Sequence, residues 1–320
     1  MFNNILVFRN DRFGEFLLNI PAIRALKVSN PGSRLTLVVD PYVVALARCI
    51  EGVDEVIGWK NTKHGLGEVL KFSGRLKRKK FDLCMVLNPS KESHIISFFA
   101  AIPVRLGYNR KWGFLLNRKA KDKKALSHKH EVEHNLDLVS LVGATTKDLS
   151  LSLSLNNDII ISYIKGLGLG NRENLVAVHP WTSDPVKQWH PDRFRSLVEK
   201  LISELKLNVV IVGGKEEAAR SWDLFSGFGK SLIDLSAKTD LVQLAAVLKS
   251  CRLLISGDSG PVHLACCVNT PVLALFRNDL PGKTSKRWGP WAANCAVIEK
   301  PGLDNISVEE VFDKVKEMLR

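Results

Sequence analysis

The chain has 320 residues, 45% of them hydrophobic, and a formal net charge of +13. This length leaves room for two domains of ordinary size. No run of about 18 uncharged apolar residues occurs, which argues against a transmembrane helix. The start of the chain lacks the basic region of a signal peptide, so we expect none. Six scattered cysteines without C-x-x-C spacing predict reduced thiols in a cytoplasmic protein, not a disulfide framework.

The positive charge is concentrated in the first half. Residues 1–160 hold 25 Lys and Arg against 15 Asp and Glu, a net charge of +10, whereas residues 161–320 hold 21 against 18, a net charge of +3. This excess predicts an acidic partner for the first half, such as a phosphorylated substrate, an anionic lipid surface or nucleic acid. Charge that only keeps the protein in solution is the alternative.

Strand and helix patterns alternate along the first half, which predicts a parallel sheet with helices on both faces. The expected strands are residues 5–8, 34–39, 55–57, 81–87 and 104–106, and the expected helices are 16–26, 42–50, 66–80, 93–101 and 131–142. Residues 107–130 interrupt this alternation with a basic loop that carries interleaved aromatic residues and a single acidic one, Asp122. Such a loop suits a phosphate-bearing or anionic ligand.

The alternation begins again in the second half. The expected strands are residues 175–178, 209–212, 253–255 and 272–276, and the expected helices are 156–165, 191–205, 215–225, 240–248, 261–268 and 307–319. We place the domain boundary near residue 155, giving domains 1–155 and 156–320, although the helix at 156–165 suits either side. The glycine-rich stretch 166–171 lies near this junction.

Glu15 stands where the first strand passes through a short loop into a helix. A helix N-terminus presents unpaired backbone N–H groups and the positive end of a dipole, so a carboxylate there stays ionised and can act as a base. The alternative is an ordinary first-turn carboxylate that only complements the helix dipole.

Three loops that follow strands of the second half form the candidate ligand site, because ligands bind at the carboxyl ends of strands in parallel sheets. In Gly257–His263, small residues allow a phosphate to approach the backbone. A lysine in the loop after His179 can neutralise a diphosphate, and a carboxylate after Gly213 and Gly214 can accept the hydroxyls of a ribose. Each loop has an ordinary structural alternative. The glycine-rich turn can simply connect two elements, the lysine can be an ordinary surface residue, and the carboxylate can be first-turn helix charge. The candidate donor-binding residues are Thr182, Ser183, Lys187, Glu216, Glu217, Asp258, Ser259, Gly260 and His263.

Other chemistries lack their usual sequence signs. No D-x-D pair occurs. The spacing of His128, His130 and His134 is possible for zinc, but no cysteine or carboxylate cluster completes such a site, so we favour a solvated basic loop and expect no metal site. The chain also has no Walker A loop, no G-x-S-x-G elbow and no G-x-G-x-x-G after the first strand. These absences disfavour simple NAD or ATP chemistry.

Taken together, four motifs resemble the heptosyltransferases of lipopolysaccharide biosynthesis, glycosyltransferase family nine, over nearly the whole chain. The motifs are Arg9-x-Asp11-Arg12-x-Gly14-Glu15 with Pro21–Arg24, His179-Pro180 leading to Lys187-Gln188-Trp189, Gly213-Gly214-x-x-Glu217, and Asp258–Pro261 followed by His263-Leu264-Ala265. The resemblance implies a GT-B fold, in which two Rossmann-like α/β domains with parallel sheets face a central cleft. Similar folds also allow the last helix to pack back on the first domain.

The resemblance further implies an inverting, metal-independent glycosyltransferase that moves a heptose from ADP-heptose onto a glycolipid. The nucleotide-sugar donor binds the second domain as a substrate, without a further cofactor, and Glu15 is the base. The family usually has aspartate at the position of Glu15, so the longer glutamate requires a shifted backbone or acceptor. The expected acceptor-binding residues are Arg12, Arg105, Arg110, Lys111, Arg118 and Lys121.

The resemblance also sets the expected partners. The acceptor is the lipopolysaccharide core or a related acidic or phosphorylated glycolipid, and the chain is expected to be a cytoplasmic monomer that meets an anionic membrane surface at the inner face. One alternative is a degenerate relative that binds nucleotide sugar or glycolipid without catalysis, because Glu15 replaces the usual aspartate. A nucleic-acid binder is another alternative, but it leaves the phosphate-binding loops unexplained, and we expect no nucleic acid partner.

Overall fold

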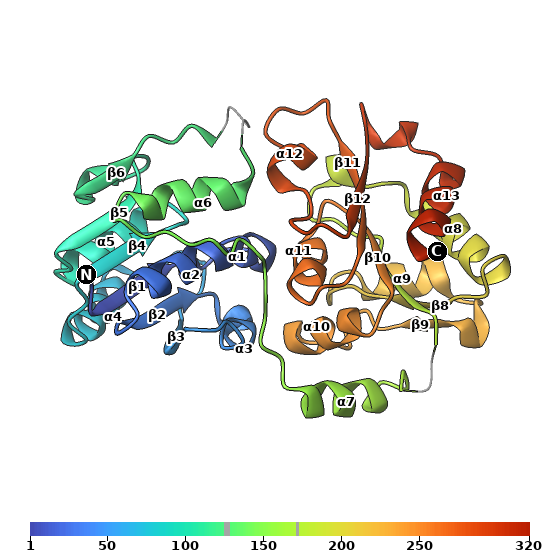
Figure 1. Cartoon of the computed structure of the whole chain (residues 1–320), viewed down its shortest axis with the longest axis horizontal. Coiled ribbons are helices and arrows are strands. Elements are labelled where there is room, and N and C mark those ends of the chain that lie inside the picture. The colour runs from blue at the N-terminus through green and yellow to red at the C-terminus, as the bar shows by residue number, and fades with distance from the viewer. Residues whose placement is uncertain (125–128, 171–172) are drawn as a thin grey trace. The chain divides into compact units, whose positions relative to one another are not determined.

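The computed structural model describes residues 1–124, 129–170 and 173–320. It divides into two compact units, Met1–Ser150 and Leu151–Arg320, and helices cover the strands in each of them (Figure 1). The division falls five residues before the boundary expected near residue 155. Asn171 of the glycine-rich stretch and His128 of the histidine group lie outside the described residues.

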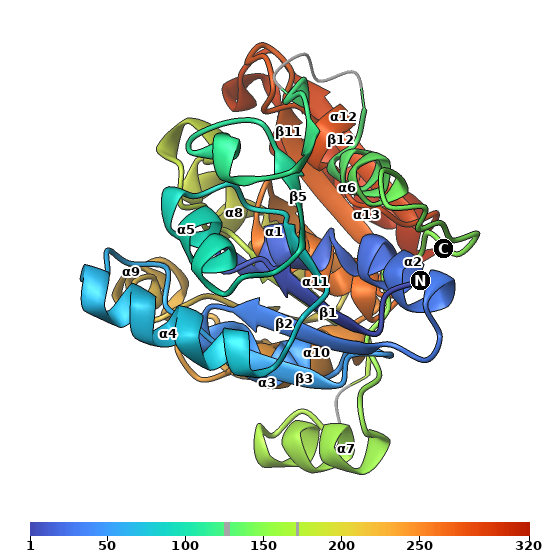
Figure 2. The same ribbon diagram turned by 90° about the vertical axis from the view of Figure 1, so that its left-hand side faces the viewer.

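The first unit is built on a six-stranded parallel sheet in the order β3-β2-β1-β4-β5-β6. Helices α4 and α5 cover one face, and α2 and α6 pack together on the other (Figure 2). The predicted parallel sheet with helices on both faces is therefore confirmed. Its elements are β1 (Asn4–Phe8), α1 (Phe13–Leu17), α2 (Ile20–Ser29), β2 (Arg34–Val39), α3 (Val44–Ala47), β3 (Glu55–Gly58), α4 (Leu66–Arg78), β4 (Leu83–Val86), α5 (Lys91–Phe99), β5 (Val104–Tyr108), β6 (Arg118–Ala120) and α6 (Glu131–Ser140).

The second unit repeats this architecture, with strand order β12-β11-β10-β7-β8-β9 and all pairings parallel. Near-continuous apolar residues in its central strands are buried by helices on both faces, as parallel sheets require. The elements are α7 (Asn157–Gly166), β7 (Leu175–His179), α8 (Pro191–Ser203), β8 (Asn208–Ile211), α9 (Ala218–Phe225), β9 (Leu232–Asp234), α10 (Leu241–Lys249), β10 (Leu253–Gly257), α11 (Gly260–Cys267), β11 (Val272–Arg277), α12 (Ser285–Trp288), β12 (Cys295–Lys300) and α13 (Val308–Leu319).

The first predicted helix, residues 16–26, is wrong as a single element, because the chain breaks between α1 and α2. Pro21 lies in the first turn of α2 and has no N–H to continue the earlier helix. The side-chain amide of Asn19 donates instead to the carbonyls of Glu15 (2.7 Å) and Phe16 (3.0 Å), which ends α1. The turn of helix that carries Glu15 is therefore a separate element, held by Asn19.

The last helix, α13, packs against α8, and its buried Val311, Phe312 and Val315 join the core that contains Trp189. The structure thus places α13 in the second unit. Within the described ranges, no helix combines the length and the apolar character needed to span a bilayer.

Candidate functional site

Three loops of the second unit lie at one edge of its sheet. Strands β10, β7 and β8 are neighbours and parallel, so the loops that follow them leave from adjacent carboxyl ends. A Cβ added at Gly257 would lie 3.4 Å both from the Thr182 methyl group and from the Lys187 carbonyl. The loops after β7 and β10 are therefore in contact, which brings together two of the three sequence motifs.

A buried polar cluster joins these two strand ends. The Nδ1 atom of His179 lies 3.2 Å from the Ser256 hydroxyl and 3.1 Å from the Ser259 hydroxyl, and the two hydroxyls are 2.8 Å apart. Burial lowers the pKa of His179 to about 4, so the ring is neutral at neutral pH. The sequence motif included His179 only as a strand end, but the structure shows that it orients Ser259.

Ser259 is the N-cap residue of α11, yet its hydroxyl makes no capping hydrogen bond within the described residues. Its partners are His179 and Ser256 instead. A helix start that lacks a side-chain cap leaves first-turn N–H groups available, and these groups together with the helix dipole favour an anion. Gly260, the first helical residue, has no side chain to block this approach.

Charged side chains flank the start of α11. Lys187 and Asp258 form an ion pair, and both are largely buried. Lys283 pairs with Asp184 at 2.8 Å in the loop before Lys187. Carboxylates thus hold both of these lysines in place. Lys187 lies beside the start of α11 and can neutralise a diphosphate group bound there.

The third loop distinguishes the two candidate carboxylates. Glu216 is exposed, whereas Glu217 is half-buried, and a Cβ added at Gly214 would lie 2.7 Å from the Glu217 Oε2 atom. The Glu217 carboxylate therefore folds back over Gly214 at the end of β8. Of the remaining candidates, Ser183 is exposed, Thr182 donates from its hydroxyl to the Asp184 carbonyl at 2.8 Å, and His263 is buried in α11.

Glu15 of the first unit lies beside a second carboxylate, and one buried arginine binds both. The Arg9 Nη2 atom donates to Glu15 at 2.8 Å, and its Nε atom lies 2.8 Å from Asp11. Its Nη1 atom donates to the Leu87 carbonyl at 3.2 Å, just beyond the end of β4. Arg9 is 4% exposed, whereas the Glu15 side chain is 34% exposed. The arrangement holds the Glu15 side chain in an accessible position.

The two carboxyl groups differ in their surroundings. Burial raises the pKa of Asp11 to about 6, and the charge of Glu15 and a hydrogen bond with it also act upward, while the charge of Arg9 opposes the rise. Burial alone would lower the pKa of Arg9, but the charges of Asp11, Glu15 and Glu131 raise it above its ordinary value. Asp11 therefore exchanges a proton near neutral pH, directly beside Glu15.

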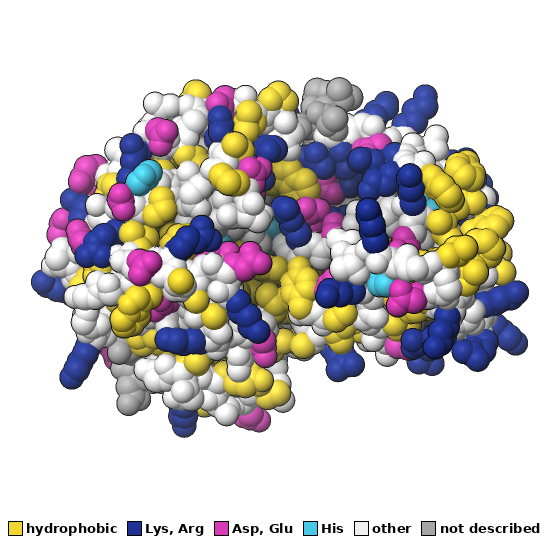
Figure 3. Space-filling model, turned by 180° about the vertical axis from the view of Figure 1, so that it is seen from behind, with side chains coloured by type: hydrophobic (Ala, Val, Ile, Leu, Met, Phe, Trp, Pro, Cys, Tyr) yellow, Lys and Arg dark blue, Asp and Glu magenta, His cyan; other side chains and the backbone are white. Residues whose placement is uncertain are grey.

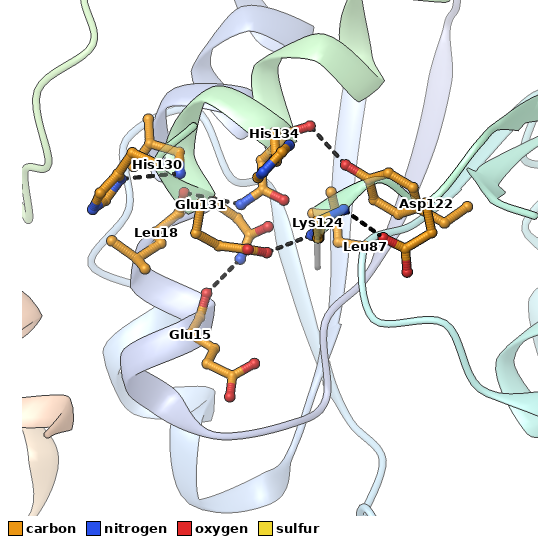
Figure 4. Close-up of polar contacts among 12 residues, drawn as sticks. Glu15, Leu18, Leu87, Asp122, Lys124, His130, Glu131 and His134 are labelled. Atoms are coloured by element: carbon orange, nitrogen blue, oxygen red, sulfur yellow. Dashed lines mark hydrogen bonds and ion pairs between the residues drawn. The ribbon is translucent and has the colours of Figure 1, made fainter. Parts of the chain in front are cut away.

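Glu131, at the start of α6, is a third carboxylate near Arg9. It is 1% exposed and forms an ion pair with Lys124 (Figure 4). Lys124 also lies over the Tyr108 ring, 4.5 Å from its centroid. The sequence did not single out Glu131, because it reads there as one of several acidic residues in the first turn of a helix. Its charge also helps to raise the pKa of Arg9, which links it to the arginine that binds Glu15.

The candidate acceptor-binding residues are spread along the sheet. Arg110, Lys111 and Lys121 follow the ends of β5 and β6, at the same edge as the Glu15 loop, and Arg12 is the exposed N-cap residue of α1. Arg105 lies within strand β5, opposite Cys84 of β4 in the sheet register. Its guanidinium donates to the carbonyls of Ile102 (2.6 Å) and Leu115 (2.8 Å). Arg118 begins the edge strand β6. The structure does not bring Arg105 and Arg118 to the edge that carries Glu15.

The described part of the histidine group has local structural roles. His130 caps α6 by accepting from the Val132 N–H at 3.3 Å, and His134 accepts the Tyr108 hydroxyl at its backbone carbonyl. Across residues 1–124, 129–170 and 173–320, no three or more His, Cys, Asp or Glu side chains group as ligands for a metal ion.

Two six-stranded parallel α/β units are the architecture of the GT-B fold, and solved heptosyltransferase structures share it. Residues 69–315 match the model of glycosyltransferase family 9 (heptosyltransferase), and the chain belongs to this family. The resemblance noted in the sequence is therefore confirmed.

Relatives match over almost the whole length. Lipopolysaccharide heptosyltransferase 3 of Escherichia coli K12 is 24% identical, with 96% of this chain and 90% of the relative covered. The structure of E. coli ADP-heptose lipopolysaccharide heptosyltransferase II has a TM-score of 0.87 at 21% identity, covering 99% of this chain and 98% of the other. An E. coli heptosyltransferase solved with ADP has a TM-score of 0.78 at 19% identity, covering 98% and 99%.

Proposed function

We propose that the chain transfers a heptose from ADP-heptose to the core of a lipopolysaccharide or a related glycolipid. The observation that carries this proposal is the start of α11, where uncapped N–H groups, Ser259 and Lys187 gather at the ends of β7 and β10. This chemistry suits a diphosphate. The E. coli heptosyltransferase solved with ADP supports adenosine as the nucleoside.

In this proposal the second unit binds the donor. The N–H groups at Gly260 and the Ser259 hydroxyl donate to the diphosphate. The Lys187 ammonium, which pairs with Asp258 in the structure, also binds the phosphates. Glu217, which lies over Gly214, accepts the ribose hydroxyls. Fixed donors that face the departing ADP stabilise the negative charge that develops on it in the transition state.

Glu15 is the proposed general base. It takes the proton from an acceptor hydroxyl while that oxygen attacks the anomeric carbon and the bond from this carbon to the ADP oxygen breaks. A single displacement of this kind inverts the anomeric carbon, and no metal ion takes part. Arg9 fixes the direction of the Glu15 side chain by its hydrogen bond. Because Glu15 is one methylene longer than the aspartate usual in the family, the acceptor hydroxyl sits farther from the α1 backbone.

The proposed acceptor is an acidic or phosphorylated glycolipid at the inner face of the cytoplasmic membrane. Three cations lie at the same sheet edge as Glu15, namely Arg110, Lys111 and Lys121. They can bind the phosphates of the acceptor. The excess of positive charge in residues 1–160 supports an anionic acceptor for the first unit. The alternative, a relative that binds these molecules without catalysis, rests on Glu15 alone.

Thermal unfolding with ADP, UDP, GDP and CDP tests the donor, because a ligand that binds only the folded state raises the Tm. ADP is expected to raise the Tm most. A larger rise with another nucleotide would contradict the proposal that ADP-heptose is the donor. Mass spectrometry of ADP-heptose incubated with heptose-deficient lipopolysaccharide in EDTA then tests the reaction. Donor binding without transfer would favour the non-catalytic alternative.

A further inference from the structure

Four large aromatic side chains are exposed on one side of the first unit. Phe98 and Phe99, at the end of α5, are 45% and 50% exposed, and Trp112 and Phe114 are 40% and 69% exposed. Phe114 lies in a short 3-10 helix, Gly113–Leu115, that packs against α5. The two pairs therefore belong to one continuous surface. Exposed apolar side chains that gather in this way mark an interaction site in a folded protein.

Cations are built into the same surface. The Lys91 Nζ atom lies 5.8 Å from the centroid of the Trp112 ring, and the Arg105 guanidinium lies 5.5 Å from that of Phe98. Residues 104–124 contain eight Lys and Arg and one acidic residue, Asp122, which pairs with Arg110. Hydrophobic side chains adjoin Lys and Arg on this side of the first unit (Figure 3). We call Lys91, Phe98, Phe99, Arg105, Lys111, Trp112 and Phe114 the aromatic–basic surface.

We infer that the aromatic–basic surface docks the chain on an anionic lipid bilayer, with its aromatic rings among the headgroups and its cations on lipid phosphates. Aromatic side chains favour the boundary between headgroups and acyl chains, and nearby Lys and Arg add attraction to anionic lipids. Two signals of this kind together give stable binding, whereas either alone binds weakly.

The positive charge of the aromatic–basic surface favours an anionic bilayer over other partners. Cations on β6, the edge strand, would by themselves discourage pairing with another sheet, but that role needs no exposed aromatic rings. A protein partner would usually meet a surface whose centre is depleted in charged side chains. Here the cations lie directly over the rings, at Lys91 and Arg105. A bilayer accommodates both, because long basic side chains reach the phosphates while the rings go deeper.

The inference deepens the proposed function by naming the surface that meets the membrane of the acceptor. Its test measures vesicle binding alone, without donor or transfer. A failure of binding therefore concerns this surface, and a failure of transfer concerns the proposed reaction.

The experiment is co-sedimentation of the full chain with phosphatidylcholine vesicles, with and without about a third phosphatidylglycerol. We expect binding only to the anionic vesicles, and weaker binding at higher salt. Trp112→Ala with Phe114→Ala should reduce partition roughly tenfold, and Lys91→Glu with Lys111→Glu at least as much. Trp222→Ala, which removes a 70% exposed tryptophan from α9 of the second unit, should bind as wild type does. Circular dichroism verifies the folding of each variant.

Three results would overturn the inference. The first is the absence of binding to anionic vesicles. The second is full binding by the variant without Trp112 and Phe114, which would indicate electrostatic adsorption without insertion. The third is stronger binding to a single-stranded oligonucleotide than to the vesicles, with loss in the same aromatic variant, which would assign the surface to nucleic-acid stacking.

Discussion

The Arg9 guanidinium donates to the Glu15 carboxylate over 2.8 Å, from a position that is almost fully buried. Hydrogen bonds between charged groups are about twice as strong as neutral ones. Arg9 also contacts Asp11 and the Leu87 carbonyl, so its guanidinium is held at three points. Glu15 is therefore oriented by a fixed cation, which is what a positioned base requires.

Asp11 gives this arrangement a pH dependence. The folded-state pKa of Asp11 is raised to about 6, so its contribution to stability is fully present below its ordinary pKa of 3.8 and is lost as the pH rises through 6. As the pH rises from 4 to 7, wild type should lose unfolding free energy that Asp11→Asn does not lose, because asparagine does not titrate. The variant should therefore become more stable relative to wild type over this range. Urea unfolding at several pH values measures the difference. A difference independent of pH would contradict the raised pKa.

His94, in α5, should make the first unit sensitive to acid. It is fully buried, and neither ring nitrogen has a hydrogen-bond partner in the described part of the chain. Burial and then the charge of Lys111 lower the pKa of His94 to about 4, so stability is present above its ordinary pKa of 6.5 and is lost as the pH falls through 4. Wild type should lose about 2.5 kcal/mol of unfolding free energy through His94 between pH 7.5 and 4.5, and His94→Leu should not show this loss. Equal acid sensitivity in both proteins would refute this assignment.

The neighbouring Glu216 and Glu217 form a matched pair for the ribose site. Glu217 folds over Gly214 and Glu216 is exposed, so Glu217→Gln should weaken ADP binding roughly tenfold by weakening hydrogen bonds to the ribose. Glu216→Gln should bind as wild type does. Isothermal titration calorimetry gives both Kd values. The opposite order would move the site to Glu216.

Lys187 should bind the diphosphate and not only Asp258. Lys187→Ala is expected to weaken ADP binding at least roughly tenfold, because it removes a charge-assisted hydrogen bond to phosphate. Lys165→Ala, which removes an exposed lysine of α7, is the control. Adenosine, which has no phosphate, should bind both variants as it binds wild type. If adenosine binding falls as much as ADP binding in Lys187→Ala, the lysine has a structural role only.

The fold was largely predictable because buried parallel strands are continuous apolar runs. The strands that the sequence missed lack this signal. Strand β6 is Arg118-Lys119-Ala120, a short polar edge strand, and β9 has three half-buried residues at the other sheet's edge. Strand β12 is also an edge strand, and most of its residues are half-buried. An edge strand is specified by pairing with its neighbour more than by its own composition.

The candidate site was predictable where a motif is local and not where it depends on distant parts of the chain. Short motifs are enough to single out Glu15 and Ser259 as candidates. The role of Arg9 depends on Leu87, 78 residues away, and that of His179 on Ser256, 77 residues away. The burial of Glu131 depends on packing of α6 that no local pattern indicates. Arg105 was assigned from its charge, but its hydrogen bonds to Ile102 and Leu115 direct it elsewhere.

The most direct test of the account is heptose transfer by Glu15→Gln, measured by mass spectrometry of the acceptor, with ADP binding followed by calorimetry. Glu51→Gln, which alters an exposed carboxylate of the same unit, is the control. The account predicts that Glu15→Gln lowers the transfer rate by roughly 100-fold or more while ADP binds unchanged, because the base is lost and the donor site is intact. Transfer by Glu15→Gln at the wild-type rate would contradict it.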